Sequence, residues 1–322
     1  MTTRHLVDPE LAALLDHIPT TVLTAEILKQ IRAMSPQATA DVSQFAALSV
    51  SERFISGPEG APDVRVLVYL PNSVQEAVPA LLWLHGGGYI MGSADAEDLT
   101  VKSIVSTLGC AAVSVDYRLA PETPYPGPVE DCYAALKWLA THADELGIDL
   151  KRIAVGGSSA GGGLAAALAL LTRDRGEFSL AFQFLLAPMI DDRTCTLANP
   201  HPYTGEFIWT PEANRFGWTA LLGQEPGGTD VSPYAAAARA ERLEGLPATF
   251  LYVGALDLFL EEDLEYARRL MRAGVPTELH VYPGAYHGFR MVADARVTQT
   301  AERDLLAALK RAFDPAHRSK VF

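Results

Sequence analysis

The residues with the clearest chemical potential lie in a glycine-rich stretch, residues 154–165 (AVGGSSAGGGLA). Only one frame of it fits the pattern G-x-S-x-G, residues 157–161, whose central serine is a nucleophile on a sharp turn from a strand into a helix. The apolar residues before this turn and the alanine- and leucine-rich residues after it favour such a strand and helix. The spacing matches neither the phosphate-binding loop G-x-x-x-x-G-K-[ST] nor the dinucleotide loop G-x-G-x-x-G. We therefore predict that Ser159 is a nucleophile.

A serine nucleophile needs a general base, normally an imidazole that a carboxylate orients. When the serine lies on such a turn, the acid and then the histidine follow it in the sequence, each in a loop after a late strand. Asp257 follows the apolar run 248–253, and His287 follows the run 278–282. We predict a triad of Ser159, His287 and Asp257.

Other acids and histidines fit this order less well. His280 lies inside its predicted strand, and His85 precedes the serine. Residues 261–263 (EED) fall in the first turn of a predicted helix, where the helix dipole alone favours carboxylates. The doublet at 191–192 also ends a strand, and we give it less weight than Asp257.

Backbone amides that could stabilise an oxyanion occur at two places. Ala160 would begin the helix after Ser159, so its amide and the positive end of the helix dipole would face the substrate. Residues 84–92 (LHGGGYIMG) follow another predicted strand, and their consecutive glycines allow amides to point into a site that side chains would block. We expect both segments to contribute to one oxyanion hole.

The rest of the chain supplies the elements that would position these loops. Short apolar runs alternate with longer helical patterns, which predicts an α/β fold with a mostly parallel sheet flanked by helices. The predicted strands are 80–84, 111–115, 153–155, 181–186, 248–253 and 278–282, with an antiparallel edge hairpin from 64–69 and the region near Phe54. The predicted helices are 129–143, 159–172, 261–273 and 298–312. Ligands of such sheets bind beyond the carboxyl ends of the strands, where the candidate residues fall.

Two segments do not fit the alternation, residues 1–45 with helical periodicity and the aromatic-rich residues 194–233. We predict that they form a helical cap. No internal repeat or low-complexity linker separates them from the rest, so we expect residues 1–322 to form a single domain.

Composition excludes several classes of protein. The formal net charge of −13 argues against a nucleic-acid partner and against an anionic membrane surface. Neither a signal peptide nor a run of about 18 apolar residues is present, which predicts a cytoplasmic protein. Three cysteines without C-x-x-C spacing predict neither a disulfide framework nor a zinc site. No metal or organic cofactor is expected.

With HGGG at 85–88, DYRLAPE at 116–122, the serine turn, Asp257 and His287 in that order, the chain resembles the bacterial hormone-sensitive-lipase-like (family IV) esterases of the α/β-hydrolase fold. The resemblance covers nearly the whole chain. It implies a capped α/β-hydrolase fold with an eight-stranded sheet, an oxyanion hole formed by the amides of Gly87, Gly88 and Ala160, a preference for short acyl esters, and often a homodimer.

The chain departs from the family pattern at two positions. Ser158 stands where members usually have Asp, Glu or Thr before the nucleophile, and Leu258 stands where many have Pro after the acid. Neither departure removes a predicted triad member.

These observations predict a serine carboxylesterase that acts on small-molecule esters through an acyl-enzyme. Pocket walls are predicted from Tyr89, Met91, Phe207, Trp209, Phe216, Trp218 and Leu258, although packing of the cap on the core would explain any one of them. An amidase, a lactonase or an arylformamidase would use the same catalytic groups. A non-catalytic small-molecule receptor on the same fold, such as the gibberellin receptors that resemble this family, lacks the catalytic histidine, whereas His287 is present here.

Overall fold

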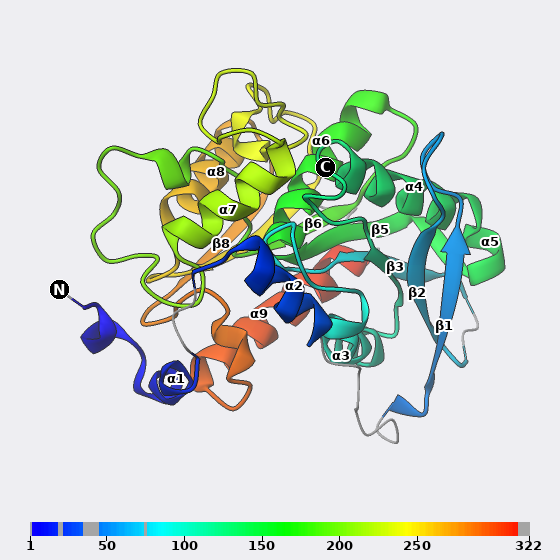
Figure 1. Ribbon diagram of the computed structural model, residues 1–322. Helices are drawn as coiled ribbons and strands as arrows, with labels where there is room; N and C mark the ends of the chain where they lie inside the picture. Colours follow the sequence, from blue (N-terminus) through cyan, green and yellow to red (C-terminus); the bar gives the residue numbers. More distant parts are fainter. Residues whose placement is uncertain (1, 19–21, 35–44, 74–75, 315–322) are drawn as a thin grey trace.

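The computed structural model describes residues 2–18, 22–34, 45–73 and 76–314. Its centre is an eight-stranded sheet in the order β1-β2-β4-β3-β5-β6-β7-β8, with β1 at one edge and β8 at the other (Figure 1). The strands are β1 (Leu48–Ile55), β2 (Val64–Pro71), β3 (Val78–Leu84), β4 (Ala111–Asp116), β5 (Ile148–Ser158), β6 (Phe182–Leu186), β7 (Ala248–Gly254) and β8 (Thr277–Tyr282).

The sheet is mostly parallel, as the sequence predicts. Strand β2 runs antiparallel to both β1 and β4, and the pairs from β4 to β8 are parallel. The six predicted strands and the edge hairpin are therefore confirmed. Strand β5 begins at Ile148 rather than at residue 153, because Asp149, Lys151 and Arg152 interrupt the apolar run although their backbone still belongs to the strand. Strand β3 is buried almost throughout, as expected for a central strand that is covered on both faces.

The helices are α1 (Pro9–Ala12), α2 (Ala25–Ala33), α3 (Asp98–Leu108), α4 (Gly127–Thr141), α5 (Ala143–Leu146), α6 (Ala160–Arg175), α7 (Pro211–Leu222), α8 (Leu260–Arg272) and α9 (Arg296–Phe313). The four predicted helices correspond to α4, α6, α8 and α9. Helix α3 is absent from the prediction, although Val101, Ile104 and Val105 have helical spacing and form its buried face. It ends at Gly109, whose φ of 62° is the left-handed conformation common after a helix.

The helices cover both faces of the sheet. Helices α3 and α9 pack against each other on one side, and α4 and α6 pack against each other on the opposite side (Figure 1). Helix α6 is buried from Ala160 to Thr172, which explains why that stretch is rich in alanine, glycine and leucine on every face rather than amphipathic. The helix that follows Ser159 is therefore held firmly in the core.

The N-terminal segment lies against elements from the other end of the chain. The amide of Asp8 donates to the carbonyl of Gly284, and the hydroxyl of Tyr286 donates to the carbonyl of Leu11. In Figure 1 this segment, with α1, lies beside the region that leads into α9. Within the predicted cap, residues 1, 19–21 and 35–44 lie outside the described residues. The division into one domain with a cap stays a prediction.

Candidate active site

Ser159 lies on the turn between β5 and α6 in a backbone conformation that residues other than glycine rarely adopt. Its φ is 53° and its ψ is −119°. The surroundings fix this conformation, since the Ser159 amide donates to the carbonyl of Leu186 at 2.9 Å and its carbonyl accepts from the amide of Met189 at 3.0 Å. Strained residues held by their surroundings are concentrated at functional sites. The turn predicted from G-x-S-x-G is thus present, with the strand before it and the helix after it.

The glycines of this motif are explained by contact with the end of β3. A Cβ atom on Gly157 would lie 2.0 Å from the carbonyl oxygen of Leu84, and a Cβ atom on Gly161 would lie 2.0 Å from the same oxygen. Real Cβ contacts are never that short, and the obstacle is backbone rather than a flexible side chain. The spacing of two residues on either side of Ser159 therefore follows from how closely the turn approaches β3.

The structure brings the three predicted triad residues together. The Nε2 atom of His287 lies 2.9 Å from the Oγ atom of Ser159, and its Nδ1 atom lies 2.8 Å from the Oδ2 atom of Asp257. Asp257 is fully buried, and its other oxygen accepts a hydrogen bond from the amide of Phe259 at 3.0 Å. This geometry is compatible with a catalytic triad in the order that the sequence predicts.

The rival residues have other partners. His280 pairs with Glu278 of its own strand at 2.9 Å. His85 is buried, stacks on Tyr117 and has its Nδ1 atom 2.8 Å from the carbonyl oxygen of Gly86. Burial lowers the pKa of His85, so its ring is neutral near pH 7. These contacts account for both histidines without a catalytic role.

The glycine loop after β3 has a fixed shape and two available amides. The amides of Ile90 and Met91 both donate to the carbonyl of Gly87, at 3.1 and 3.0 Å, and close the loop on itself. Within the part of the chain that the structure describes, no protein acceptor takes the amide hydrogen of Gly87 or of Gly88. The amide of Ala160 begins α6 and has no acceptor inside that helix. Loop and helix thus offer free amide donors, and their role as an oxyanion hole stays a prediction.

The predicted pocket residues fall into two groups. Trp209, Phe207 and Met91 lie around the glycine loop or the loop of His287. The other group packs with the hydrophobic core: Phe216 is partly buried against it, and Tyr89 and Trp218 are fully buried with their ring centroids 5.2 Å apart. A Cβ atom on Gly88 would lie 2.1 Å from the ring of Trp209. Leu258 lines a separate cavity of about 320 Å³ beside Pro211. Their roles in substrate binding stay predictions.

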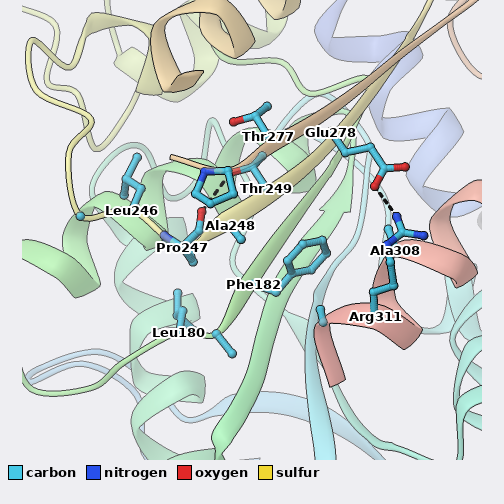
Figure 2. A pocket seen from close by; sticks show the side chains of 14 residues that line it. Leu180, Phe182, Leu246, Pro247, Ala248, Thr249, Thr277, Glu278, Ala308 and Arg311 are labelled. Atoms are coloured by element: carbon cyan, nitrogen blue, oxygen red, sulfur yellow. Dashed lines mark hydrogen bonds and ion pairs between the residues drawn. The ribbon is translucent and has the colours of Figure 1, made fainter. Parts of the chain in front are cut away.

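A larger cavity, of about 470 Å³, lies at the opposite end of the strands (Figure 2). Phe182, Ala248 and Thr277, which line it, are the first residues of β6, β7 and β8. Its rim carries the ion pair of Glu278 and Arg311. Asp257 and His287 follow the other ends of these strands, so this cavity contains none of the predicted site residues.

Two buried carboxyl groups lie in the first turn of α8, close to the triad. Burial raises the pKa of Glu262 well above its ordinary value, and the nearby charge of Asp191 raises it further. Burial also raises the pKa of Asp263 well above its ordinary value, and the charges of Glu262 and Asp257 add to this shift. Glu262 accepts hydrogen bonds from the amides of Ile190 and Asp191, at 2.8 and 3.2 Å. Neither oxygen of Asp263 has a hydrogen-bond partner among the described residues. Burial and the neighbouring acidic groups therefore favour the protonated form of Asp263.

Sequence reasoning missed one residue of this region, Glu97. It accepts a hydrogen bond at 2.9 Å from the hydroxyl of Ser158, the residue that departs from the family pattern. Glu97 stands in an acidic run, residues 95–98 (DAED), and its spacing from the motifs gave no signal.

The described residues contain neither a candidate membrane-spanning helix nor a candidate metal site. None of the helices there is both long and apolar enough to span a membrane. No group of three or more histidine, cysteine, aspartate or glutamate side chains in the same residues is arranged to hold a metal ion.

Several known proteins that resemble this chain are esterases. A family model described as the alpha/beta hydrolase fold matches residues 81–291. Carboxylesterase NlhH of Mycobacterium tuberculosis is 36% identical over 315 residues, which cover 95% of this chain and 96% of that protein. A bacterial heroin esterase superposes with a TM-score of 0.91 at 43% identity, covering 97% of this chain and 100% of that chain. Esterase LipW from Mycobacterium marinum superposes with a TM-score of 0.85 at 34% identity, covering 97% and 98%.

The chain therefore belongs to the α/β-hydrolase fold family. Within that family its relatives are carboxylesterases of the hormone-sensitive-lipase-like group, which confirms the resemblance noted in the sequence.

Proposed function

We propose that the chain is a serine carboxylesterase that hydrolyses short-chain acyl esters of small molecules. The observation that carries this proposal is the continuous chain of hydrogen bonds from Asp257 through His287 to Ser159. The names of the relatives, carboxylesterase and esterase, support the same reaction class. The presence of His287 within hydrogen-bond distance of the serine argues against a non-catalytic receptor.

In the first half of the reaction, Ser159 attacks the ester carbonyl carbon while Nε2 of His287 accepts the hydroxyl proton. Asp257 holds the imidazole in the tautomer with a proton on Nδ1 and stabilises the imidazolium that forms. The carbonyl oxygen becomes an oxyanion, which the amides of Gly87, Gly88 and Ala160 stabilise. The tetrahedral intermediate collapses, the C–O bond to the alcohol breaks, and His287 gives its proton to the leaving alkoxide.

In the second half, water attacks the acyl-enzyme through the same groups. His287 accepts a proton from the water, and the oxyanion again lies against the loop amides. Collapse of this second intermediate releases the carboxylic acid, and His287 returns its proton to Ser159. Every proton transfer uses side chains of this chain.

The preference for short acyl groups would follow from the indole of Trp209. Its ring occupies the space directly beside Gly88, and its Nε1 donates to Oδ1 of Asn214 at 3.1 Å, which restricts its movement. Trp209 is only 7% exposed and Asn214 is fully buried. A large rigid side chain beside the oxyanion loop leaves little room for a long chain at that position.

The helical cap is part of this proposal. Residues 1–45 and 194–233 would cover a single α/β-hydrolase domain. Arg32 of α2 supports this, because its guanidinium donates to the carbonyl of Ile90 at 2.7 Å and to that of Ala120 at 2.6 Å. These hydrogen bonds hold helix α2 against Ile90, which lies two residues after Gly88.

We also propose that the protein works in the cytoplasm, as its sequence predicts, and that it forms a homodimer, as the family resemblance implies. Light scattering of the purified protein tests the second point directly. A mass of twice 34.7 kDa is expected, and a mass of 34.7 kDa at micromolar concentration would contradict it.

Hydrolysis of p-nitrophenyl esters from acetate to palmitate tests the reaction. Activity highest on the short esters and lost in Ser159→Ala is expected. A second measurement separates the adjacent serines, because a p-nitrophenyl phosphate diester should modify Ser159 and leave Ser158 free on peptide mapping. Full activity of the Ser159→Ala variant, or no ester hydrolysis by the folded wild type, would contradict the proposed function.

A further inference from the structure

The carboxylate of Glu97 joins the nucleophile turn to the glycine loop. Glu97 lies in the 3₁₀ turn η4 (Asp95–Glu97), between the glycine loop and α3. Its Oε1 atom accepts two hydrogen bonds of 2.9 Å, one from the hydroxyl of Ser158 and one from the amide of Gly86. Its Oε2 atom accepts a third, from the indole of Trp83 at 2.8 Å. One side chain thus connects β3, the loop after β3 and the turn after β5.

Two of these partners adjoin the proposed catalytic groups. Ser158 directly precedes Ser159, and Gly86 directly precedes Gly87. The ladder between β3 and β5 ends with the pair Leu84 and Gly157. The bridge through Glu97 is therefore a connection between the two chains just beyond the point where strand pairing stops.

An ionised carboxylate suits this position better than any other side chain. All three partners are hydrogen-bond donors, and a carboxylate is an acceptor only. Its three hydrogen-bond donors are neutral groups, and the buried guanidinium of Arg290 interacts with it electrostatically without forming an ion pair among the described residues. Charge-assisted hydrogen bonds of this kind are shorter and stronger than neutral ones. A glutamine would direct its amide hydrogens at one or more of the same donors.

We infer that Glu97 is a positioning residue that sets the distance between the Ser159 nucleophile and the amides of Gly87 and Gly88. It acts through Ser158 and Gly86 and touches no reacting atom. The inference rests on the proposed esterase function. It also gives Ser158 a defined role, as the link through which the carboxylate holds the serine turn.

A purely structural role for Glu97 makes a different prediction. Loss of a structural bridge would lower stability and leave the rate of the folded enzyme unchanged. Loss of a positioning bridge would lower the rate, because a displacement of about 1 Å in a reacting group can cost roughly 100-fold. It would also weaken transition-state analogues in proportion, whereas substrate binding before the chemical step would stay similar.

The test compares Glu97→Gln, Ser158→Ala and the double variant with the wild type on p-nitrophenyl butyrate. A trifluoromethyl ketone is the second probe, since its adduct with the serine carries the oxyanion. We expect kcat to fall roughly 10- to 100-fold in Glu97→Gln, with KM within about twofold and the inhibition constant of the ketone raised by a similar factor. Ser158→Ala should also lower kcat, and the double variant should be little slower than Glu97→Gln, because both changes break one bridge.

The matched control is Asp98→Asn. Asp98 is the next residue, and its carboxylate is also hydrogen-bonded, to Tyr69 at 2.9 Å and to Lys102 at 2.6 Å, but it contacts neither the turn nor the loop. It should lower Tm and leave kcat and the inhibition constant within about twofold. Equal effects in Asp98→Asn, or unchanged kcat and inhibition constant in folded Glu97→Gln or Ser158→Ala, would overturn the inference. If Glu97→Gln does not fold, Ser158→Ala decides by the same measurements. Failure of the proposed function would instead appear in the wild type or in Ser159→Ala.

Discussion

His287 and Ser159 lie 128 residues apart in the sequence, yet Nε2 of one is 2.9 Å from Oγ of the other. The two residues come from loops after β8 and β5, which are separated in the sheet by β6 and β7. Parallel strands all direct their carboxyl ends to the same edge of the sheet, so loops far apart in the chain meet there. The site is thus a product of sheet topology.

Replacing Asp257 with asparagine should abolish most activity without unfolding the protein. The amide carries no negative charge to stabilise an imidazolium, and its NH2 group can donate a hydrogen bond to Nδ1 of His287, which favours the wrong tautomer of the histidine. We expect kcat on p-nitrophenyl butyrate to fall by about 10³- to 10⁴-fold with little change in KM. Steady-state kinetics measure kcat and KM, and circular dichroism checks that the variant is folded. Activity within tenfold of the wild type would show that another acid serves His287.

Much of this site follows from local sequence patterns. The residues around Ser159 and the residues before His287 carry strand, turn and helix signals within a few positions of the functional groups. The order of serine, acid and histidine then selects Asp257 and His287 among several rivals. The predicted strands follow from apolar runs that only a sheet covered on both faces would bury.

The contacts of Glu97 and Asp263 were beyond sequence reasoning for a physical reason. Both are acidic residues in acidic runs, where solvent-exposed side chains are the normal expectation. The burial of Asp263 and the partial burial of Glu97 depend on how the first turn of α8 and the turn before α3 pack against the sheet. No local pattern encodes that packing. Helix α3 is a different case, because the helical spacing of its apolar residues is visible in the sequence.

Stability should depend on pH through Asp263. Burial raises the pKa of Asp263 above its ordinary value of 3.8. Above that pH the unfolded chain releases the proton while the folded protein keeps it, so the free energy of unfolding falls as pH rises, by about 1.4 kcal/mol per pH unit for one group. The loss continues until the pH reaches the raised pKa. Asp263→Asn removes this loss, so the difference between its Tm and that of the wild type should grow as the pH rises above 3.8 toward the raised pKa.

Glu262 offers a matched contrast in the same helical turn. Its carboxylate satisfies the amides of Ile190 and Asp191. Glu262→Leu leaves these buried donors without a partner, at a cost of about 1–3 kcal/mol for each. Thermal unfolding near pH 4.5 should therefore show a lower Tm for Glu262→Leu, and because the pKa of Glu262 is also raised above 4.5, the deficit should shrink as the pH rises. A Tm difference between Asp263→Asn and the wild type that stays constant as the pH changes would contradict the raised pKa of Asp263.

Alanine at Gly161 should prevent folding, whereas alanine at Gly176 should be tolerated. The new Cβ atom at Gly161 would lie 2.0 Å from the carbonyl oxygen of Leu84 and 2.4 Å from that of His85, and neither backbone group is free to move. Gly176 has a φ of 68° and no atom within 4 Å of such a Cβ, so only the left-handed backbone conformation is penalised, by about 1–2 kcal/mol. Soluble yield and Tm of the two variants test the contrast, and a folded, active Gly161→Ala enzyme would contradict it.

Substitution of Trp209 should change which acyl chains the enzyme accepts. Trp209→Ala removes the ring that lies against Gly88 and frees space beside the proposed oxyanion loop. Each methylene that a hydrophobic pocket can newly bury is worth about 1 kcal/mol or more, so the ratio of kcat/KM on p-nitrophenyl octanoate to that on the acetate should rise about tenfold or more. Asn214→Ala is the matched variant, because it keeps the ring but removes the acceptor of its indole hydrogen bond. Asn214→Ala should also raise the ratio of kcat/KM on the octanoate to that on the acetate, but by a smaller factor than Trp209→Ala. An unchanged ratio in Trp209→Ala would place the acyl chain elsewhere, and the short-chain limit would then need a different wall of the site.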